Sequence, residues 1–438
     1  MDFLRNEEPM KTESLCLHAG YTPKNGEPRV LPIVQSTTFT YDSTAEVAKL
    51  FDLETSGFFY TRLGNPTLGA VEEKLASLEK IAALEGGVGA LCTSSGQAAN
   101  LIAILNVAQS GDHVVSMASI YGGTFNLFAV TLKKMGIEVT FVDQRADDAE
   151  IEKAIRPNTK AVFGETLTNP SMDVLDIERI AALAHRHGLP LIVDNTFATP
   201  VLCRPFDFGA DIVVHSTTKY MDGHALQMGG VIVDSGKFDW TSGRFPEFTE
   251  PDASYHGLIY TKAFGKAAYI VKARVQLMRD LGCCQTPQGA FYINQGLETL
   301  PLRMERHCRN AEAVATFLAG HGKVESVCYP WLPDSHDKAL AEKYLPRGCS
   351  GVISFSLKGG RDAEARFIDC LKMVSLQVHV ADIRTCVLHP ASSTHRQLTD
   401  EQLVAAGITP GLIRLSVGLE HIDDILQDLE KGFSALKK

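Results

Sequence analysis

Long apolar runs are missing from this sequence. No stretch of about 18 consecutive apolar residues occurs, and a helix that crosses a bilayer needs at least that length. The first residues, MDFLRNEEPMKTES, contain no apolar segment of the kind that a secretion signal carries. We therefore expect a cytoplasmic protein that is neither exported nor inserted into a membrane.

An excess of basic residues is also missing. The chain has 42 Lys and Arg against 52 Asp and Glu, which gives a net charge of −10, and it has no block of like charges. A protein that binds nucleic acid or anionic lipid needs a basic face. The composition therefore argues against nucleic acid and membrane as partners and favours a small-molecule substrate.

Two familiar kinds of binding motif are absent. The ten cysteines are scattered, and none forms a CxxC pair or a Cys/His cluster with the spacing of metal ligands. We predict reduced thiols and no metal site. No GxGxxG follows the first predicted strand, which disfavours an oxidoreductase that binds a dinucleotide.

Alternating strands and helices make up most of what is present. A chain of 438 residues with 45% hydrophobic residues can bury a large core and is expected to form two domains. The alternation predicts an α/β fold, with a mostly parallel sheet between helices in a large domain and a smaller C-terminal α/β domain. Strands are predicted at residues 88–92, 114–117, 137–142, 161–163, 191–193, 212–214, 230–233, 352–357 and 412–417.

The chain divides into three predicted parts. Residues 1–60 are rich in proline and polar residues, look irregular and are expected to form an arm that lies on another surface. Residues 61–260 contain the predicted large sheet. Residues 261–438 are expected to begin with one long linking helix over 261–281 and to end with the smaller domain.

Two of the predicted strands end in polar residues that suit one cofactor. The run 191–193 is followed by Asp194, and the run 212–214 is followed by the segment HSTTK that ends at Lys219. Ligands of open α/β sheets bind at the carboxyl ends of the strands. This set suits pyridoxal 5'-phosphate (PLP), with Lys219 as the Schiff-base amine and Asp194 as the partner of the pyridinium nitrogen. Taken singly, the lysine could be a surface residue and the aspartate an ordinary turn residue.

Another strand-to-helix turn is suited to a phosphate. Ser95, Gly96 and Gln97 follow a predicted strand and open a helix, where backbone N–H groups can approach an anion. Ser216 and Thr218 would add hydroxyl donors. The alternative is an ordinary helix cap, since many such turns carry Ser-Gly.

Two further residues stand out by their positions. Tyr121 lies at a strand-to-helix turn and could stack on a cofactor ring, although a partly buried structural tyrosine is an equal alternative. Arg414 lies within a buried-looking strand and must be paired there, either with a substrate carboxylate or with an internal acid.

Seven ordered segments resemble the Cys/Met-metabolism family of PLP-dependent enzymes. They are YTRLGNPT at 60–67, SSGQAA at 94–99, YGGT at 121–124, ETLTNP at 165–170, DNTFATP at 194–200, HSTTKYMDGH at 215–224 and RLSVGLE at 414–420. Within this family the chain is most similar to the O-acetylhomoserine aminocarboxypropyltransferases, or sulfhydrylases. The resemblance implies the aminotransferase-like fold, fold type I, with residues 61–260 as the PLP-binding domain.

The resemblance also implies residue roles and an assembly. Lys219, Asp194 and Tyr121 would be catalytic residues that also bind the cofactor. The phosphate would be held by Ser95, Gly96, Gln97, Ser216 and Thr218 from one subunit and by Tyr60 and Arg62 from its neighbour. The substrate carboxylate would be held by Arg414, Ser375 and Asn169. A site shared in this way requires a homo-oligomer, with the arm at the subunit interface and a tetramer as the usual assembly.

The implied reaction is γ-replacement. O-acetyl-L-homoserine would react with sulfide or a small thiol to give homocysteine or methionine and acetate. The alternatives are a γ-lyase and a γ-substitution with another nucleophile, including carbon. Gly123 weighs against the methionine γ-lyases, which typically have cysteine there. The run ALQM at 225–228, with His379 and Ala381 where Asn and Gly are common, departs from the subfamily near the expected substrate pocket.

Overall fold

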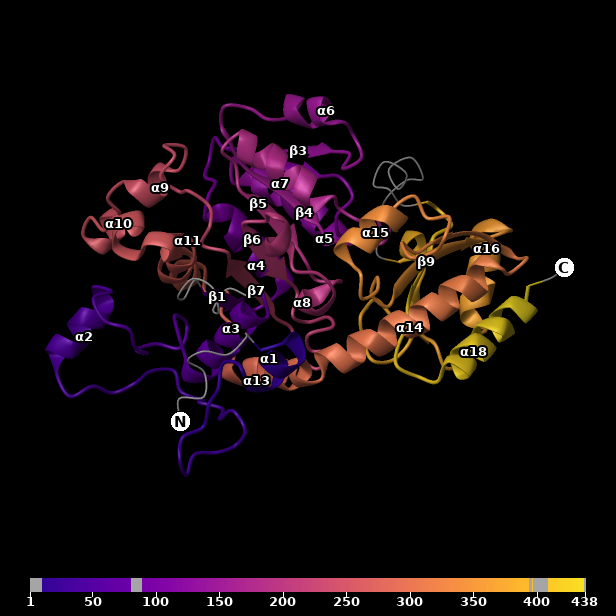
Figure 1. Ribbon diagram of the computed structural model, residues 1–438, viewed down its shortest axis with the longest axis horizontal. Helices are drawn as coiled ribbons and strands as arrows, with labels where there is room; N and C mark the ends of the chain where they lie inside the picture. Colours follow the sequence, from indigo (N-terminus) through magenta and orange to yellow (C-terminus); the bar gives the residue numbers. More distant parts are fainter. Residues whose placement is uncertain (1–9, 80–88, 394–395, 397–408, 437–438) are drawn as a thin grey trace.

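The computed structural model describes residues 10–79, 89–393, 396 and 409–436, and it contains two β-sheets. The larger sheet lies in the middle of the molecule, and the smaller one lies at the end that carries the C-terminus (Figure 1). The predicted α/β class, with a larger and a smaller sheet, is confirmed.

Seven strands form the larger sheet, in the order β1-β7-β6-β5-β4-β2-β3. Only β7 runs antiparallel to its neighbours, so the prediction of a mostly parallel sheet is confirmed. Nearly every residue of the inner strands is buried, as expected for a sheet covered on both faces. The strands are β1 (Ala90–Thr93), β2 (His113–Met117), β3 (Glu138–Val142), β4 (Thr159–Glu165), β5 (Leu191–Asp194), β6 (Ile212–His215) and β7 (Gly230–Asp234). Val88, the first residue of a predicted strand, lies outside the described residues.

Helices cover this sheet. α4 packs against β6 and β7, and α7 packs against β5. None of the described helices is both long and apolar enough to cross a bilayer. The helices are α3 (Pro66–Leu78), α4 (Gly96–Leu105), α5 (Gly122–Asn126) with a π-helical continuation at Leu127–Leu132, α6 (Asp148–Lys153), α7 (Ile177–Arg186), α8 (Thr199–Leu202) and α9 (Pro246–Thr249).

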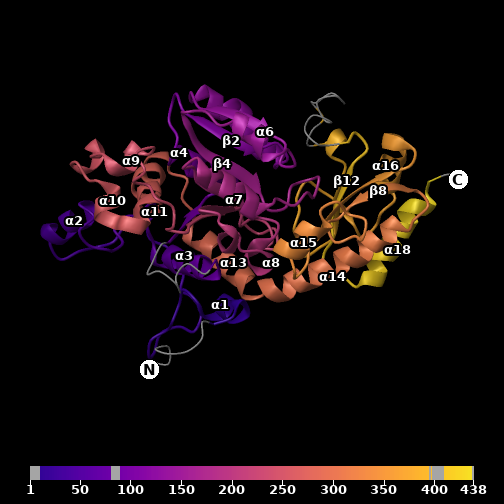
Figure 2. The same ribbon diagram turned by 45° about the horizontal axis from the view of Figure 1, so that its top comes forward.

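The smaller sheet has the strand order β10-β11-β12-β9-β8. α14 and α16 pack against β9, and α18 packs against both helices (Figure 2). α18 buries Ile425, Leu429 and Phe433, as its periodicity predicts. The elements are β8 (Val324–Cys328), β9 (Val352–Leu357), β10 (Ser375–Leu376), β11 (Cys386–Leu388), β12 (Ile413–Ser416), α14 (Leu300–Ala319), α15 (Lys338–Tyr344), α16 (Gly360–Asp369) and α18 (Ile422–Ser434).

The prediction of one long helix over 261–281 is wrong. The segment forms three short helices, interrupted by a 3₁₀ turn that starts at Gly265 and by a π-helical stretch. Gly265 has a φ of 52°, which a helical residue does not adopt. The helix that runs from the larger sheet to the smaller one is α14 (Figure 1). The short helices are α10 (Tyr260–Phe264), α11 (Ala268–Lys272) and α12 (Arg279–Leu281), followed by the unpredicted α13 (Pro287–Glu298). The domain boundaries at 60 and 260 stay predictions.

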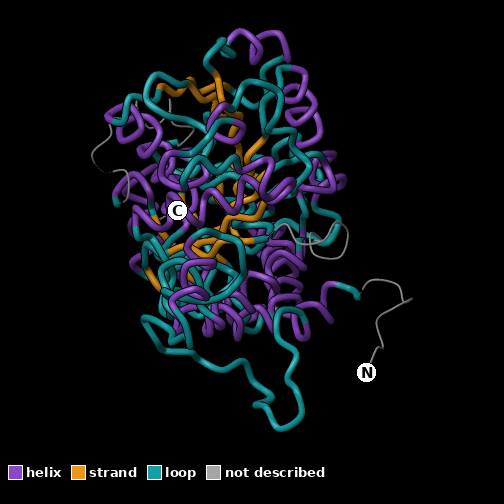
Figure 3. Tube along the Cα trace, turned by 90° about the vertical axis from the view of Figure 1, so that its left-hand side faces the viewer, coloured by secondary structure: helices purple, strands orange, loops and turns teal. Residues whose placement is uncertain are grey.

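The N-terminal segment is less irregular than predicted. It contains α1 (Thr12–His18) and α2 (Thr44–Phe51), and the Ser43 side chain caps α2 by accepting from the backbone N–H of Glu46. α1 packs on α3 and α13. Figures 1 and 3 show loops of this segment that extend away from the rest of the molecule. The irregular character is therefore correct for these loops and wrong for the two helices.

Candidate active site

The carboxyl edge of the larger sheet brings two acidic residues together. Glu165 ends β4 and Asp194 ends β5, and the two are partners in the parallel register. Burial and the nearby Asp194 carboxylate raise the pKa of Glu165 well above its usual value. Burial therefore favours the protonated form of Glu165, and two carboxyl groups meet at this edge of the sheet.

Lys219 lies in the turn that follows β6. Its Nζ is 3.4 Å from Nδ1 of His379. Burial first, and the positive charge of Arg414 second, lower the pKa of Lys219 to about 8. An amine in this range is partly neutral at neutral pH, so it can act as a nucleophile or a base. This is the property that the Schiff-base hypothesis requires.

Asp194 is held by the residue two positions further on. The backbone N–H of Thr196 donates to its Oδ1 at 3.0 Å, and the Thr196 hydroxyl donates to the same oxygen. The same hydroxyl oxygen accepts from the backbone N–H of Ser216 at 2.8 Å, which ties the ends of β5 and β6 together. Burial raises the pKa of Asp194, and no cation among the described residues forms an ion pair with it. A buried carboxylate in this state is suited to a cationic ligand.

Gly96 brings the start of α4 against the turn after β6. A Cβ at Gly96 would lie 2.6 Å from the Cβ of Ser216, so only glycine permits this approach. Ser95 caps α4 and accepts from the N–H of Ala98 at 3.1 Å. The Oε1 atom of Gln97 is buried without a hydrogen-bond partner. The backbone N–H groups at this helix start are suited to a phosphate, whereas the free Oε1 of Gln97 is an acceptor and calls for a donor.

The hydroxyl of Thr218, a predicted phosphate donor, already has a hydrogen-bond partner within the chain. Its hydroxyl donates to the carbonyl of Gly229 at 3.2 Å, and its oxygen accepts from the Gly229 N–H at 2.9 Å. The hydroxyl therefore connects the turn after β6 to the start of β7, and a phosphate would have to share it.

Tyr121 directly precedes α5 at the same edge of the sheet. Its backbone N–H donates to Glu165 Oε1 at 2.7 Å, and its side chain is 48% exposed. A Cβ at Gly123 would lie 2.5 Å from Cε1 of the Tyr121 ring and 2.6 Å from Nε2 of Gln97. Any side chain at 123, cysteine included, would displace one of these two groups.

Arg414 lies on β12 and is 7% exposed. Its guanidinium donates to the carbonyls of Val378 at 2.9 Å and His379 at 3.3 Å, and to Oδ1 of Asn169 at 3.4 Å. None of its partners among the described residues is a carboxylate, which removes the internal salt bridge as an explanation there. Within the described part of the chain its charge is unmatched, and a substrate carboxylate is a natural partner for it. The site prediction also included Ser375, which lies exposed on β10.

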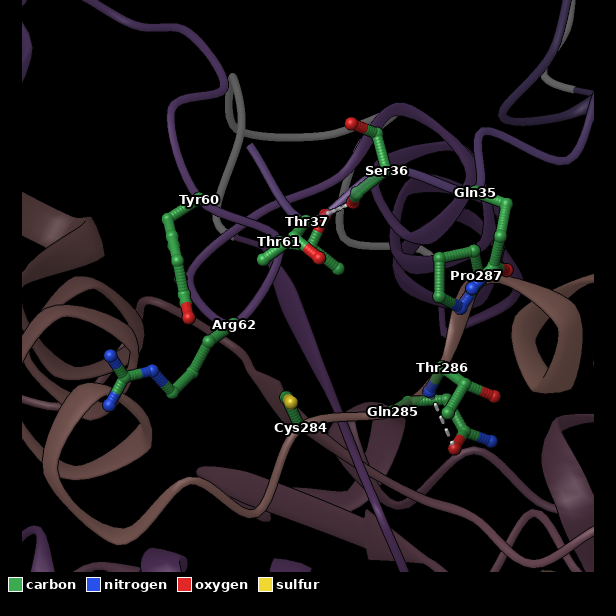
Figure 4. A pocket seen from close by; sticks show the side chains of 10 residues that line it. All are labelled: Gln35, Ser36, Thr37, Tyr60, Thr61, Arg62, Cys284, Gln285, Thr286 and Pro287. Carbon is green, nitrogen blue, oxygen red and sulfur yellow. Dashed lines mark hydrogen bonds between the residues drawn. The ribbon is translucent and has the colours of Figure 1, made fainter. Parts of the chain in front are cut away.

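Tyr60 and Arg62 lie elsewhere in the chain. They line a cavity of about 390 Å³ together with Thr37, Cys284 and Gln285, as Figure 4 shows. The Arg62 guanidinium lies 5.1 Å from the centre of the Tyr60 ring and donates to the carbonyl of Arg279. Among the described residues, neither side chain hydrogen-bonds to Lys219, Asp194 or Tyr121. The chain therefore does not gather the whole predicted cofactor set in one place.

Two residues of the site received no role from the sequence. Glu165 supports Tyr121 and neighbours Asp194, and Thr196 orients Asp194. The signal for Glu165 was its place at the end of a buried strand next to the strand of Asp194. The signal for Thr196 was the Asp-x-Thr spacing, which is typical of an aspartate turn.

The family model described as Cys/Met metabolism PLP-dependent enzyme matches residues 13–434. The chain belongs to this family. Its cofactor is accordingly PLP, as the sequence predicts. An O-acetyl-L-homoserine sulfhydrylase of Leptospira meyeri is 47% identical to this family member over 432 residues, which cover 96% of each chain.

Two solved structures of similar proteins agree with this membership. A putative O-acetylhomoserine (thiol)-lyase of Campylobacter jejuni, with N'-pyridoxyl-lysine-5'-monophosphate in its chain, is 38% identical and has a TM-score of 0.92. The match covers 97% of this chain and 100% of that one. A cystathionine gamma-lyase of Lactobacillus plantarum, complexed with L-serine, is 33% identical over 97% of this chain and 99% of that one, with a TM-score of 0.81. Both matches support the aminotransferase-like fold that the sequence predicts.

The residues at the carboxyl edge fit PLP. The half-buried carboxylate of Asp194 has no ion-pair partner among the described residues, and Gly96 lets the start of α4 lie directly against Ser216. Lys219 supplies an amine with a lowered pKa. The three groups thus suit the three parts of PLP: Asp194 its protonated ring nitrogen, the start of α4 its phosphate, and Lys219 its aldehyde.

Proposed function

We propose that this chain is a cytoplasmic transferase that catalyses γ-replacement on O-acetyl-L-homoserine with sulfide or a small thiol. The products are homocysteine or methionine and acetate. The observation that carries the proposal is the Lys219 amine, whose pKa is lowered to about 8, in one site with Arg414, which has no carboxylate partner among the described residues. The names of the similar proteins support the substrate, and the name sulfhydrylase supports replacement by sulfide.

Three groups of side chains would hold the cofactor. Lys219 would bind its aldehyde carbon, Asp194 its ring nitrogen, and the Tyr121 ring would stack on it. The phosphate would lie at the start of α4, against the residues Ser95, Gly96, Gln97, Ser216 and Thr218. When bound, PLP supplies a carbon that combines with the substrate amine and a ring that takes up negative charge.

The chain's own residues would then orient the substrate and move its protons. Arg414, with Asn169 and Ser375, would bind the substrate carboxylate and set the direction of the Cα–H bond, because a guanidinium fork fixes a carboxylate in one plane. Nζ of Lys219 would remove and return the proton at Cα, since its lowered pKa keeps part of the amine unprotonated.

One assay separates replacement from elimination. We expect the purified protein to form homocysteine from O-acetyl-L-homoserine only when sulfide is added. Equal accumulation of 2-oxobutanoate with and without sulfide would identify a γ-lyase and contradict the proposal. A panel of thiol and carbon nucleophiles extends the assay to γ-substitution, for which the departures at 225–228 and His379 are the reason to look.

We further propose that the chain forms a homo-oligomer, a tetramer of two dimers, in which the N-terminal arm completes the partner's site. Tyr60 and Arg62 line a cavity apart from Lys219 in their own chain, which supports a role in another subunit. The arm also exposes apolar side chains, including Val30 at 53% and Phe51 at 57%. Contact with a second copy would cover such residues.

Mixed assemblies test this sharing. When chains carrying Arg62→Ala and Lys219→Ala are co-expressed at equal levels, random pairing gives one intact site in half of the pairs. We expect about a quarter of the wild-type activity, although each variant alone is inactive. If each arm served its own chain, no mixed pair would contain an intact site and the mixture would stay inactive. Arg29→Ala, also in the arm, is the control and should leave activity unchanged.

A further inference from the structure

His379 is a departure from the subfamily pattern, and it lies against the most important side chain of the site. Its Nδ1 is 3.4 Å from Nζ of Lys219, although the two residues are 160 positions apart. Its backbone carbonyl accepts from Arg414 at 3.3 Å and from Sγ of Cys386 at 3.3 Å. The main chain at 379 is thus held by the arginine that faces the same site.

The His379 ring is uncharged at neutral pH. Burial first, and the charge of Lys219 second, lower the pKa of His379 to about 4. Asp382 raises it, while Arg414 and Arg384 lower it further. A neutral imidazole has one nitrogen that accepts, and the ammonium of Lys219 can only donate. Nδ1 is therefore the acceptor, and the hydrogen is on Nε2.

The other ring nitrogen, Nε2, does not tie the His379 ring to the surrounding described residues. Nε2 is buried and has no partner among the described residues. Leaving a buried donor unpaired is unfavourable, so a histidine with a structural role normally satisfies both nitrogens. Here the only hydrogen bond of the ring within the described part of the chain is the one to Lys219.

We propose that His379 is a positioning residue, which accepts a hydrogen bond from the free amine of Lys219 and holds that amine in the site. Its role in turnover rests on the proposed function, because Lys219 is released from the cofactor whenever a substrate amine replaces it. The hydrogen bond favours the protonated lysine, since a neutral acceptor stabilises an ammonium. Without His379, Lys219 would lose its proton at a lower pH and its amine would be less fixed.

The test measures the proton affinity of Lys219 in the cofactor-free, full-length protein. Lysines are labelled with acetic anhydride over a range of pH, and the rate at each lysine is read by mass spectrometry of its peptide. His379→Leu removes the acceptor next to Nζ, and His379→Gln moves it one bond away from the position of Nδ1, so we expect each to lower the pKa of Lys219 by about one unit. His379→Asn places an amide oxygen where Nδ1 was, so it should restore the wild-type value.

Lys272 is the internal control. It is 5% exposed, its pKa is also lowered to about 8 by burial, and its Nζ bonds to Asn106 rather than to a histidine. Its labelling profile should be the same in all four proteins. The groups that face Lys219 besides His379 are Arg414 and Cys386, and both stay in place.

The outcomes are distinct. An unchanged Lys219 profile in His379→Leu and His379→Gln would overturn the proposal, and so would an equal shift in His379→Asn. If the leucine variant does not fold, the polar glutamine variant decides alone. Labelling needs no turnover, so a failure of the proposed reaction in the sulfide assay would leave this result intact and be recognised separately.

Discussion

Replacing Lys219 by alanine is expected to reduce homocysteine formation by about 10³-fold, the range for loss of a general acid–base group. The reason is that the variant loses the only amine of the described site whose pKa is lowered by burial into the catalytic range. The substrate would still bind through Arg414, so the loss should appear in kcat and not in KM. Steady-state kinetics with O-acetyl-L-homoserine and sulfide measure both constants.

Chemical trapping supplies the control within the same protein. Borohydride should fix the cofactor on the peptide that contains Lys219. The peptide that contains Lys272 should carry no cofactor. The two lysines have similarly lowered pKa values, so this comparison separates position in the site from reactivity. Label on Lys272, or a Lys219→Ala enzyme with unchanged kcat, would contradict the assignment.

Replacing Asp194 by asparagine is expected to weaken PLP binding by about 10²-fold, or roughly 3 kcal/mol. Asparagine keeps the shape of the side chain and an oxygen for the two Thr196 donors, and it removes only the negative charge. A cationic ring nitrogen would then lie in a buried site without its counter-charge. Titration of the cofactor-free protein with PLP, followed by absorbance, measures the change.

The same substitution should have the opposite effect on the protein without cofactor. Burial raises the pKa of Asp194 in the folded state above its value in the unfolded chain. Folding stability from this group is therefore present at low pH and is lost as the pH rises through the folded pKa. Asp194→Asn removes that loss, so at neutral pH its Tm without cofactor should equal or exceed that of the wild type.

Asp239 offers a matched control for both measurements. It accepts from the N–H and the hydroxyl of Thr241, in the same Asp-x-Thr arrangement as Asp194 and Thr196, but on an exposed turn. Asp239→Asn should change neither the affinity for PLP nor the Tm of the cofactor-free protein at neutral pH. An Asp194→Asn protein that binds PLP as tightly as the wild type would rule out the ring-nitrogen role.

The local pattern of apolar and polar residues was sufficient to predict the inner strands of the larger sheet. Apolar runs such as 191–193 and 212–214 are short, bounded by polar residues and fully buried, so a single arrangement suits them. The stretch 261–281 misled because its composition is typical of a helix, whereas Gly265 adopts a φ of 52° and breaks it. The arm helices were missed because each is short and rests on neighbouring elements or on one cap for its stability.

The sequence by itself determined which groups stand at strand ends and helix starts. Strand polarity places Asp194 at the edge of the sheet, and the turn after the next strand carries Lys219, so their chemistry could be inferred from position. The ordered motifs then identified the family and its cofactor.

Only the tertiary structure decided how these groups affect one another. It placed Glu165 against Asp194 in the register of the sheet, and it brought His379 to Lys219 across 160 positions of the chain. Burial is a property of the packed molecule, and burial is the largest cause of the shifted pKa values of Asp194, Lys219 and His379. A proton affinity set by desolvation cannot be read from neighbours in sequence, because the atoms that exclude water come from distant segments.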